Sequence, residues 1–167
     1  MKQKMKIVSI ILFLFFGAIG VMAQEEQGKL AAKANSQEEA KQKAQEADAL
    51  DAAKRLIEIP IDNYFLSQTD ADSYQKYRLD EKIVLLKLYP DLRFYIYGYT
   101  CDEGNEEVSE YIGLRRAEKA KNYLISKGID GKRIVNVSSK HDTNPVVPNT
   151  DEENRRKNRR VQLVIVQ

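Results

Sequence analysis

The stretch GYTCDEGNEEVSEYIGLRRA fills residues 98–117 and decides the fold of the chain. It follows residues 93–99, whose alternating pattern is typical of a strand with two different faces. A polar turn comes next, and Asn105 stands where a helix cap is expected. Residues 106–127 then have helical periodicity and are followed by a glycine. The stretch therefore predicts a strand, a turn and a helix.

Arg116 is expected on the inward face of this helix. At 100° per residue it shares an arc with small or apolar side chains, namely those of Ile112, Gly113, Ala117, Ala120, Tyr123 and Leu124. Because an unpaired charge in such a place costs several kcal/mol, a buried Arg116 predicts an anionic partner. That partner is either a carboxylate of the protein, such as Asp102 or Glu103, or a ligand.

The rest of the chain supplies more strands and helices in alternation. Four strands are expected, at residues 57–66, 93–99, 133–137 and 160–167, with helices at about 77–89 and 106–127 and a short one at 151–157. Pro60 interrupts the first strand, which indicates an edge position or a bulge. We therefore predict an α/β (α+β) two-layer sandwich, with a mixed four-stranded sheet and helices on one face.

The N-terminal residues have the pattern of a secretory signal. Lys2, Lys4 and Lys6 precede an apolar run, and small residues follow it up to Ala23. We predict a signal peptide at residues 1–23, with an uncleaved membrane anchor as the alternative. Removing this segment deletes three lysines and no acids, so the formal net charge falls from +2 to −1. No cysteine follows the apolar run, so lipid attachment of the bacterial lipoprotein kind is not expected, and the mature chain should be soluble with no transmembrane span.

Residues 24–56 are rich in Ala, Glu, Lys and Gln and contain few large apolar side chains. This composition favours helix without supplying a core, and it predicts a solvated helical tether. A weak alanine-rich coiled coil is the alternative, with a poor pattern of apolar positions. The compact domain is expected at residues 57–167.

Several functional classes are disfavoured by charge and cysteine content. The mature chain is nearly neutral, and its arginine cluster at residues 155–160 directly follows three acids, so nucleic-acid binding is not expected. Cys101 is the only cysteine, which excludes an internal disulfide. Cys101 and His141 could act as nucleophile and base, but a single pair separated by two expected elements is weak support for an enzyme. We predict a binding protein without catalytic activity, cofactor or metal.

Several motifs match a known family. The triplet Gly98-Tyr99-Thr100, the segment LRRA at 114–117, and the tetrad NRRV at 158–161, spaced from Asn149 with Arg155 between them, resemble the OmpA-like domain. That domain also occurs in MotB and in peptidoglycan-associated lipoproteins. The resemblance covers roughly residues 57–167. It implies non-covalent binding of peptidoglycan, in particular of the free end of a diaminopimelate side chain.

The resemblance also implies a site with two poles, because that end of diaminopimelate carries one ammonium and one carboxylate. By position, Arg116 corresponds to the arginine that takes the carboxylate, and Thr100 to part of the binding loop. Cys101 occupies the position of the family's aspartate, so the ammonium falls to Asp102, to Glu103 or to a main-chain carbonyl. Ser109 stands where the family has an asparagine. The ligand-binding residues predicted for peptidoglycan are Thr100, Cys101, Asp102, Ser109, Arg116 and Arg155.

We thus expect an envelope protein, periplasmic or associated with the outer membrane, that holds the cell wall without cleaving it. The alternative is a structural module that keeps the fold, has lost the ligand and joins other envelope proteins. Its contact surface would be the tether or a sheet face formed by Tyr95, Tyr97 and Tyr99.

Overall fold

A computed structural model of the chain describes residues 2–166, with side chains from residue 27 onward. The chain divides into two compact units, residues 1–49 and residues 50–167. Helix α1 (Lys2–Glu58) begins in the first unit and ends in the second. Every side chain from residue 27 to 49 is exposed. Within the described part, no helix is long and apolar enough to cross a membrane. The side chains of the predicted signal peptide, residues 1–23, lie outside the described residues.

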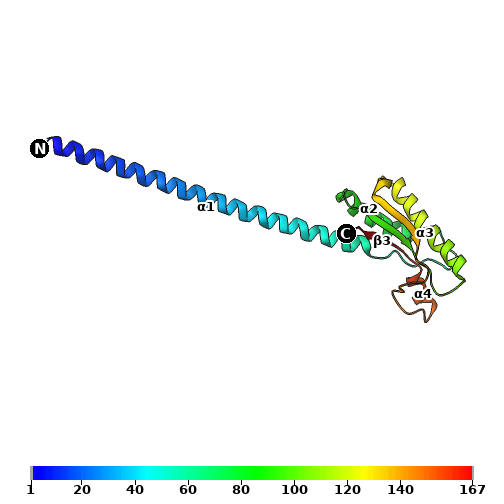
Figure 1. Cartoon of the computed structure of the whole chain (residues 1–167). Helices are drawn as coiled ribbons and strands as arrows, with labels where there is room; N and C mark the ends of the chain where they lie inside the picture. The colour runs from blue at the N-terminus through cyan, green and yellow to red at the C-terminus, as the bar shows by residue number, and fades with distance from the viewer. Residues whose placement is uncertain (1, 167) are drawn as a thin grey trace. The chain divides into compact units, whose positions relative to one another are not determined.

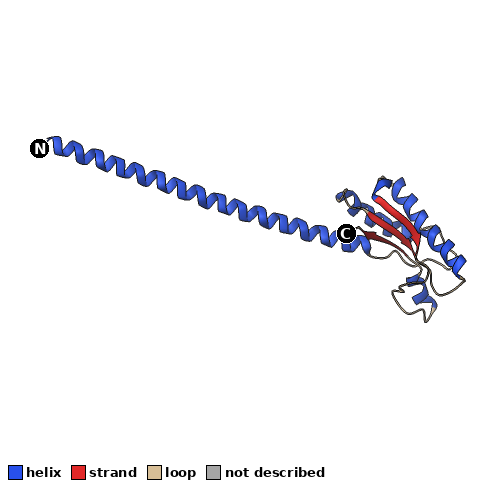
Figure 2. Cartoon of the chain, viewed as in Figure 1, coloured by secondary structure: helices blue, strands red, loops and turns tan. Residues whose placement is uncertain are grey.

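The second unit is built on a mixed sheet, drawn in red in Figure 2. Strand β1 (Phe94–Gly98) is its centre, parallel to β2 (Ile134–Ser139) on one side and antiparallel to β3 (Val161–Ile165) on the other. The parallel pairing follows from the helical crossover between β1 and β2. The α/β class and the mixed sheet are as predicted, but the described sheet has three strands.

The expected fourth strand at residues 57–66 was wrong. Helix α1 continues to Glu58, and only Ile61 reaches the sheet, as an isolated bridge to Val161. The two residues exchange backbone hydrogen bonds of 2.8 Å each. Pro60 cannot donate to a ladder, and Asn63 has a positive φ of 71°, so the chain leaves the sheet on both sides of this bridge.

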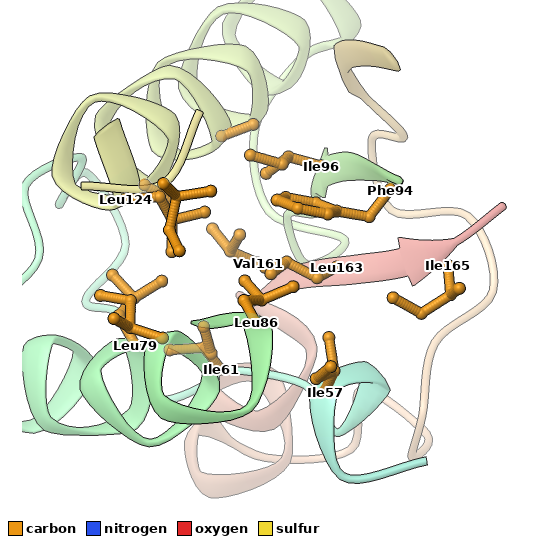
Figure 3. Close-up of a cluster of buried hydrophobic side chains, with 14 of the residues drawn as sticks. Ile57, Ile61, Leu79, Leu86, Phe94, Ile96, Leu124, Val161, Leu163 and Ile165 are labelled. Carbon is orange, nitrogen blue, oxygen red and sulfur yellow. The ribbon is translucent and has the colours of Figure 1, made fainter. Parts of the chain in front are cut away.

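Two helices cover the same face of the sheet. Helix α2 (Ser73–Leu88) begins at a capping box formed by Asp72 and Gln75, and ends before Pro90 as expected. Helix α3 (Glu106–Ser126) begins at Asn105, whose side chain accepts from the amide of Val108 at 2.9 Å. Figure 3 shows how the apolar side chains of α2, α3, β1 and β3 point toward one another. Ile57, on the last turn of α1, is also fully buried in this core.

Two glycines let α3 approach β1 closely. A Cβ added to Gly98 would lie 1.8 Å from the carbonyl oxygen of Gly113. One added to Gly113 would lie 2.3 Å from the hydroxyl of Ser139 on β2. Only a residue without a side chain fits at either place, so α3 is held at a fixed distance from the sheet.

A short helix, α4 (Glu152–Asn158), precedes β3, as the sequence predicted, and is labelled in Figure 1. The face of the sheet opposite the core carries Tyr95 and Tyr97, whose rings stack with centroids 5.8 Å apart. Tyr99 does not share their exposure. It is 7% exposed, and the guanidinium of Arg160 lies 3.6 Å from its ring centroid. The expected surface of three tyrosines is therefore reduced to two.

Candidate functional site

The loop between β1 and α3, residues 99–105, is fixed by neighbours from the C-terminal half of the domain. The amide of Tyr99 donates to the carbonyl of Arg160, and that of Thr100 to the carbonyl of His141, both at 2.8 Å. Gly104 has a φ of 104°, a conformation that favours glycine, and it leads into the cap of α3. The loop thus presents its side chains on a rigid base.

Arg116 is fully buried beneath this loop. Its guanidinium donates to four main-chain carbonyls, those of Phe65, Leu66, Gln68 and Tyr99, at 2.7–3.0 Å. The ring of Tyr64 lies 5.1 Å away. Among the described residues no carboxylate pairs with Arg116, so of the two alternatives for its partner, the salt bridge to Asp102 or Glu103 is absent. Burial lowers the pKa of Arg116 to about 10. Arg116 ties the segment before α2 to the end of β1.

A second buried guanidinium, that of Arg159, lies at the same site. Its Nε donates to the carbonyl of Tyr64 at 2.7 Å, and its Nη atoms pair with Glu152 and, at 3.5 Å, with Glu103. Its Nη1 also lies 3.4 Å from the thiol sulfur of Cys101. The site prediction did not include Arg159. The sequence does indicate that Arg159 is buried, because strand alternation places it on the same face as Val161 and Leu163, the face that turns to the core.

Arg159 lines a hollow of about 120 Å³ at the N-terminal end of α3. Thr100, Cys101 and Ser109 form its polar floor, and all three are more than nine-tenths buried. Glu103 also lines it, while the apolar part of the wall comes from Leu66, Val108 and Ile112. The hydroxyl of Thr100 is buried and has no hydrogen-bond partner among the described residues. The hollow thus combines a buried cation, a half-exposed carboxylate and a free hydroxyl.

Asp102 and Arg155, both predicted site residues, pair with each other. Their side chains are joined by a hydrogen bond of 2.9 Å from Nε of Arg155 to Oδ1 of Asp102. Asp102 borders a neighbouring hollow of about 360 Å³, which also contains His141. Cys101 and Ser109 line this hollow as well, so the two hollows adjoin. The structure therefore brings Thr100, Cys101, Asp102 and Ser109 together, with Arg155 joined to Asp102.

Cys101 and His141 do not form a nucleophile and base. The nearest partners of the thiol are Arg159 and Glu103, whereas the imidazole of His141 pairs with Glu110 at 3.0 Å. In the part of the chain that the structure describes, no group of three or more His, Cys, Asp or Glu residues could hold a metal ion.

Solved structures share this fold. The C-terminal domain of Helicobacter pylori MotB matches with a TM-score of 0.60 at 22% identity, covering 65% of this chain and 84% of that one. The peptidoglycan-associated lipoprotein of Burkholderia pseudomallei matches with a TM-score of 0.58 at 24% identity, covering 63% of this chain and 88% of that one. At these identities the likeness establishes the fold alone, which is the OmpA-like α/β fold.

Sequence comparison establishes the family. The OmpA family matches residues 67–159, more than half of the chain, and the chain belongs to that family. The peptidoglycan-binding protein ArfA of Mycobacterium tuberculosis is 38% identical over 80 residues, which make up 48% of this chain and 24% of that protein. The peptidoglycan-associated lipoprotein of Haemophilus influenzae is 34% identical over 85 residues, 51% of this chain and 55% of that protein.

The chain thus spans about a quarter of the length of the ArfA protein and about half of the length of the lipoprotein. The match over residues 67–159 includes every side chain that lines the hollow except Leu66. Membership of this family agrees with the expectation of a protein without catalytic activity.

Proposed function

We propose that this protein binds peptidoglycan non-covalently through the hollow beside α3. The observation that carries the proposal is the presence of opposite charges in one small hollow, Arg159 in its wall and Glu103 at its edge. These residues lie within the segment that matches the OmpA family, and relatives in that family are named for peptidoglycan.

The ligand that suits two opposite charges is a zwitterion, and the stem peptide of a diaminopimelate-type wall ends one side chain in such a group. Arg159 would take its carboxylate, because a guanidinium presents parallel donors to two oxygens. The hydroxyls of Thr100 and Ser109 would donate to the same group. Glu103 or Asp102 would take the ammonium, and Glu103 is the better placed of the two because it shares the hollow with Arg159. Arg116 would shape the floor through Tyr99.

The cellular setting follows from the same proposal. The signal peptide at residues 1–23 would export the chain, and residues 24–56 would act as a helical tether that sets the wall-binding domain at a distance from its attachment point. The protein would then work in the periplasm or at the outer membrane and stabilise the envelope by holding the wall. The second candidate is an OmpA-like module without ligand that joins an envelope assembly, and the thiol at position 101 is the feature that favours it.

Retention on purified sacculi tests the proposal. The full chain is expected to co-sediment with sacculi of the diaminopimelate type, and free meso-diaminopimelate should release it. Glu103→Gln should weaken retention more than Asp102→Asn does. Glu107→Gln is the matched control, because this exposed glutamate in the first turn of α3 does not line the hollow. A folded protein that stays in the supernatant would refute the proposal and support the module without ligand.

A further inference from the structure

A second hollow, of about 170 Å³, lies where the end of α1 meets α2. Three aliphatic side chains, those of Leu56, Ile59 and Leu85, form its apolar walls. The remaining lining residues are Arg78, Glu81 and Lys82, all on α2. It shares no lining residue with the hollow beside α3. Its chemistry is therefore separate from the proposed wall-binding site.

Lys82 is the deepest charged group of this hollow, with 2% of its surface exposed. Its ammonium donates to the carbonyl of Leu56 at 3.1 Å. An ammonium has three N–H donors, and this carbonyl uses one of them. Burial, and then the nearby charge of Arg78, lower the pKa of Lys82 to about 8, although Glu81 acts in the opposite direction. The positive charge at this position is thus under-compensated.

Arg78 lies one turn before Lys82 and lines the same hollow. Its Nη1 pairs with Glu81 at 3.0 Å. Its Nε is buried, and among the described residues it has no hydrogen-bond partner. A buried donor without a partner costs free energy, so this atom favours a ligand that can accept from it. Two cations therefore face one hollow that contains a single carboxylate.

The apolar walls decide what kind of anion fits. Leu56 is 52% exposed and Ile59 is 41% exposed. Both aliphatic side chains therefore leave much apolar surface in water next to the buried ammonium of Lys82. A small inorganic anion would satisfy the cations and leave these side chains in water. A ligand with an apolar body would also cover them, which adds the free energy of burying apolar surface.

We propose that the hollow between α1 and α2 binds a carboxylate carried on a short aliphatic chain. The carboxylate accepts from the ammonium of Lys82 and from Nε of Arg78, and the aliphatic chain packs on Leu56, Ile59 and Leu85. This ligand supplies the missing negative charge, engages the unpaired donor and covers the exposed apolar surface. The proposal does not depend on binding of peptidoglycan.

Titration with hexanoate, followed by NMR of the leucine and isoleucine methyl groups of the full chain, tests this site. Hexanoate is expected to shift the methyl signals of Leu56, Ile59 and Leu85 in a saturable way. It should also raise the pKa of Lys82, because a bound anion favours the charged ammonium. Acetate has the charge without the chain, and hexanol has the chain without the charge, so each should bind at least tenfold more weakly.

Two variants and one control complete the test. Arg78→Gln keeps the bond from Lys82 to Leu56 and should weaken hexanoate binding about tenfold, and Lys82→Met should weaken it at least as much. Lys87→Met is the control, because this exposed lysine lies on α2 outside the hollow, and it should bind hexanoate as the parent does. Equal responses to hexanoate and hexanol, or unchanged binding in a folded Arg78→Gln protein, would overturn the proposal.

Discussion

The loop between β1 and α3 and the contact between α1 and α2 both bury a cation, but they compensate its charge differently. Burial lowers the pKa of Arg159 in the loop region, yet its hydrogen bonds to Glu152 and Cys101 more than offset this, so that its pKa lies above the ordinary value. Lys82 in the other region has the carbonyl of Leu56, and burial lowers its pKa to about 8. A directly bonded carboxylate thus favours the charged form of a buried cation more than a carbonyl does.

The largest effect is expected for substitution of Arg116, a buried cation in the loop region whose hydrogen-bond partners are carbonyls alone. Arg116→Ala would leave the buried carbonyls of Phe65, Leu66, Gln68 and Tyr99 without their donor, and we expect the free energy of unfolding to fall by about 3–5 kcal/mol. Urea unfolding measures the change. Arg115→Ala is the control, since this exposed neighbour should cost less than about 0.5 kcal/mol. A loss of stability no larger than that of the control would mean that the four carbonyls find other partners.

The buried ammonium of Lys82 should make the free energy of unfolding depend on pH. Its pKa in the folded chain, about 8, is below its ordinary value of 10.5. Between these values the unfolded chain holds a proton that the folded chain has lost, so the free energy of unfolding should rise with pH. We expect a rise of roughly 1–2 kcal/mol from pH 8 to pH 10, measured as the difference between the parent and Lys82→Met. Lys87→Met should follow the parent over this range. A difference that does not change with pH would show that Lys82 titrates normally.

A substitution of Cys101 tests the part of the loop region that is expected to bind the ammonium of the ligand. Cys101→Asp places a carboxylate beside Arg159, whose Nη1 lies 3.4 Å from the present sulfur. The substitution should strengthen binding of meso-diaminopimelate by about fivefold. Glu152 already pairs with both Nη atoms of Arg159, so the added charge is left to attract the ammonium of the ligand. Isothermal titration calorimetry gives the dissociation constant. Cys101→Asn has nearly the same shape without the charge, so equal affinities for the two variants would rule out an electrostatic effect.

Glu152 provides the smallest expected effect. It pairs with Arg159, which holds the pKa of Glu152 below its usual value. Glu152→Gln removes the protein carboxylate that competes with the ligand for this guanidinium, so we expect affinity for meso-diaminopimelate to rise about twofold to threefold. Glu153→Gln alters an exposed pair with Lys157 and should leave affinity unchanged. Weaker binding by Glu152→Gln would indicate that Glu152 positions Arg159 and does not compete for it.

Most of the fold was predictable because its elements have clear periodicity and punctuation. Asn105 and Pro90 marked a helix start and a helix end that the structure contains. The first strand was not predictable from its apolar residues, because α1 carries Ile57 into the core and only Ile61 joins the sheet. A helix and a strand can both bury a short apolar run, so periodicity alone does not separate them.

The burial of Arg116 was predictable, but the partners of the two buried arginines were not. The burial of Arg116 followed from helical periodicity, whereas its four carbonyl partners come from loops about 50 residues earlier and from the end of β1. No local pattern encodes such contacts. The role of Arg159 depends on Glu103 and Glu152, which lie on different elements and meet only in the folded chain.

The single bridge at Ile61 has a mechanical consequence. A pull applied along α1 enters the domain next to this bridge, where Ile61 and Val161 share two backbone hydrogen bonds and the amide of Ile165 donates to the side chain of Glu58. These bonds, the bond from Lys82 to the carbonyl of Leu56 and the packing of Ile57 in the core would carry the load before the paired strands do. Under tension the segment from α1 to Ile61 is therefore the first to detach, and it can act as a weak link while β1, β2 and β3 stay together.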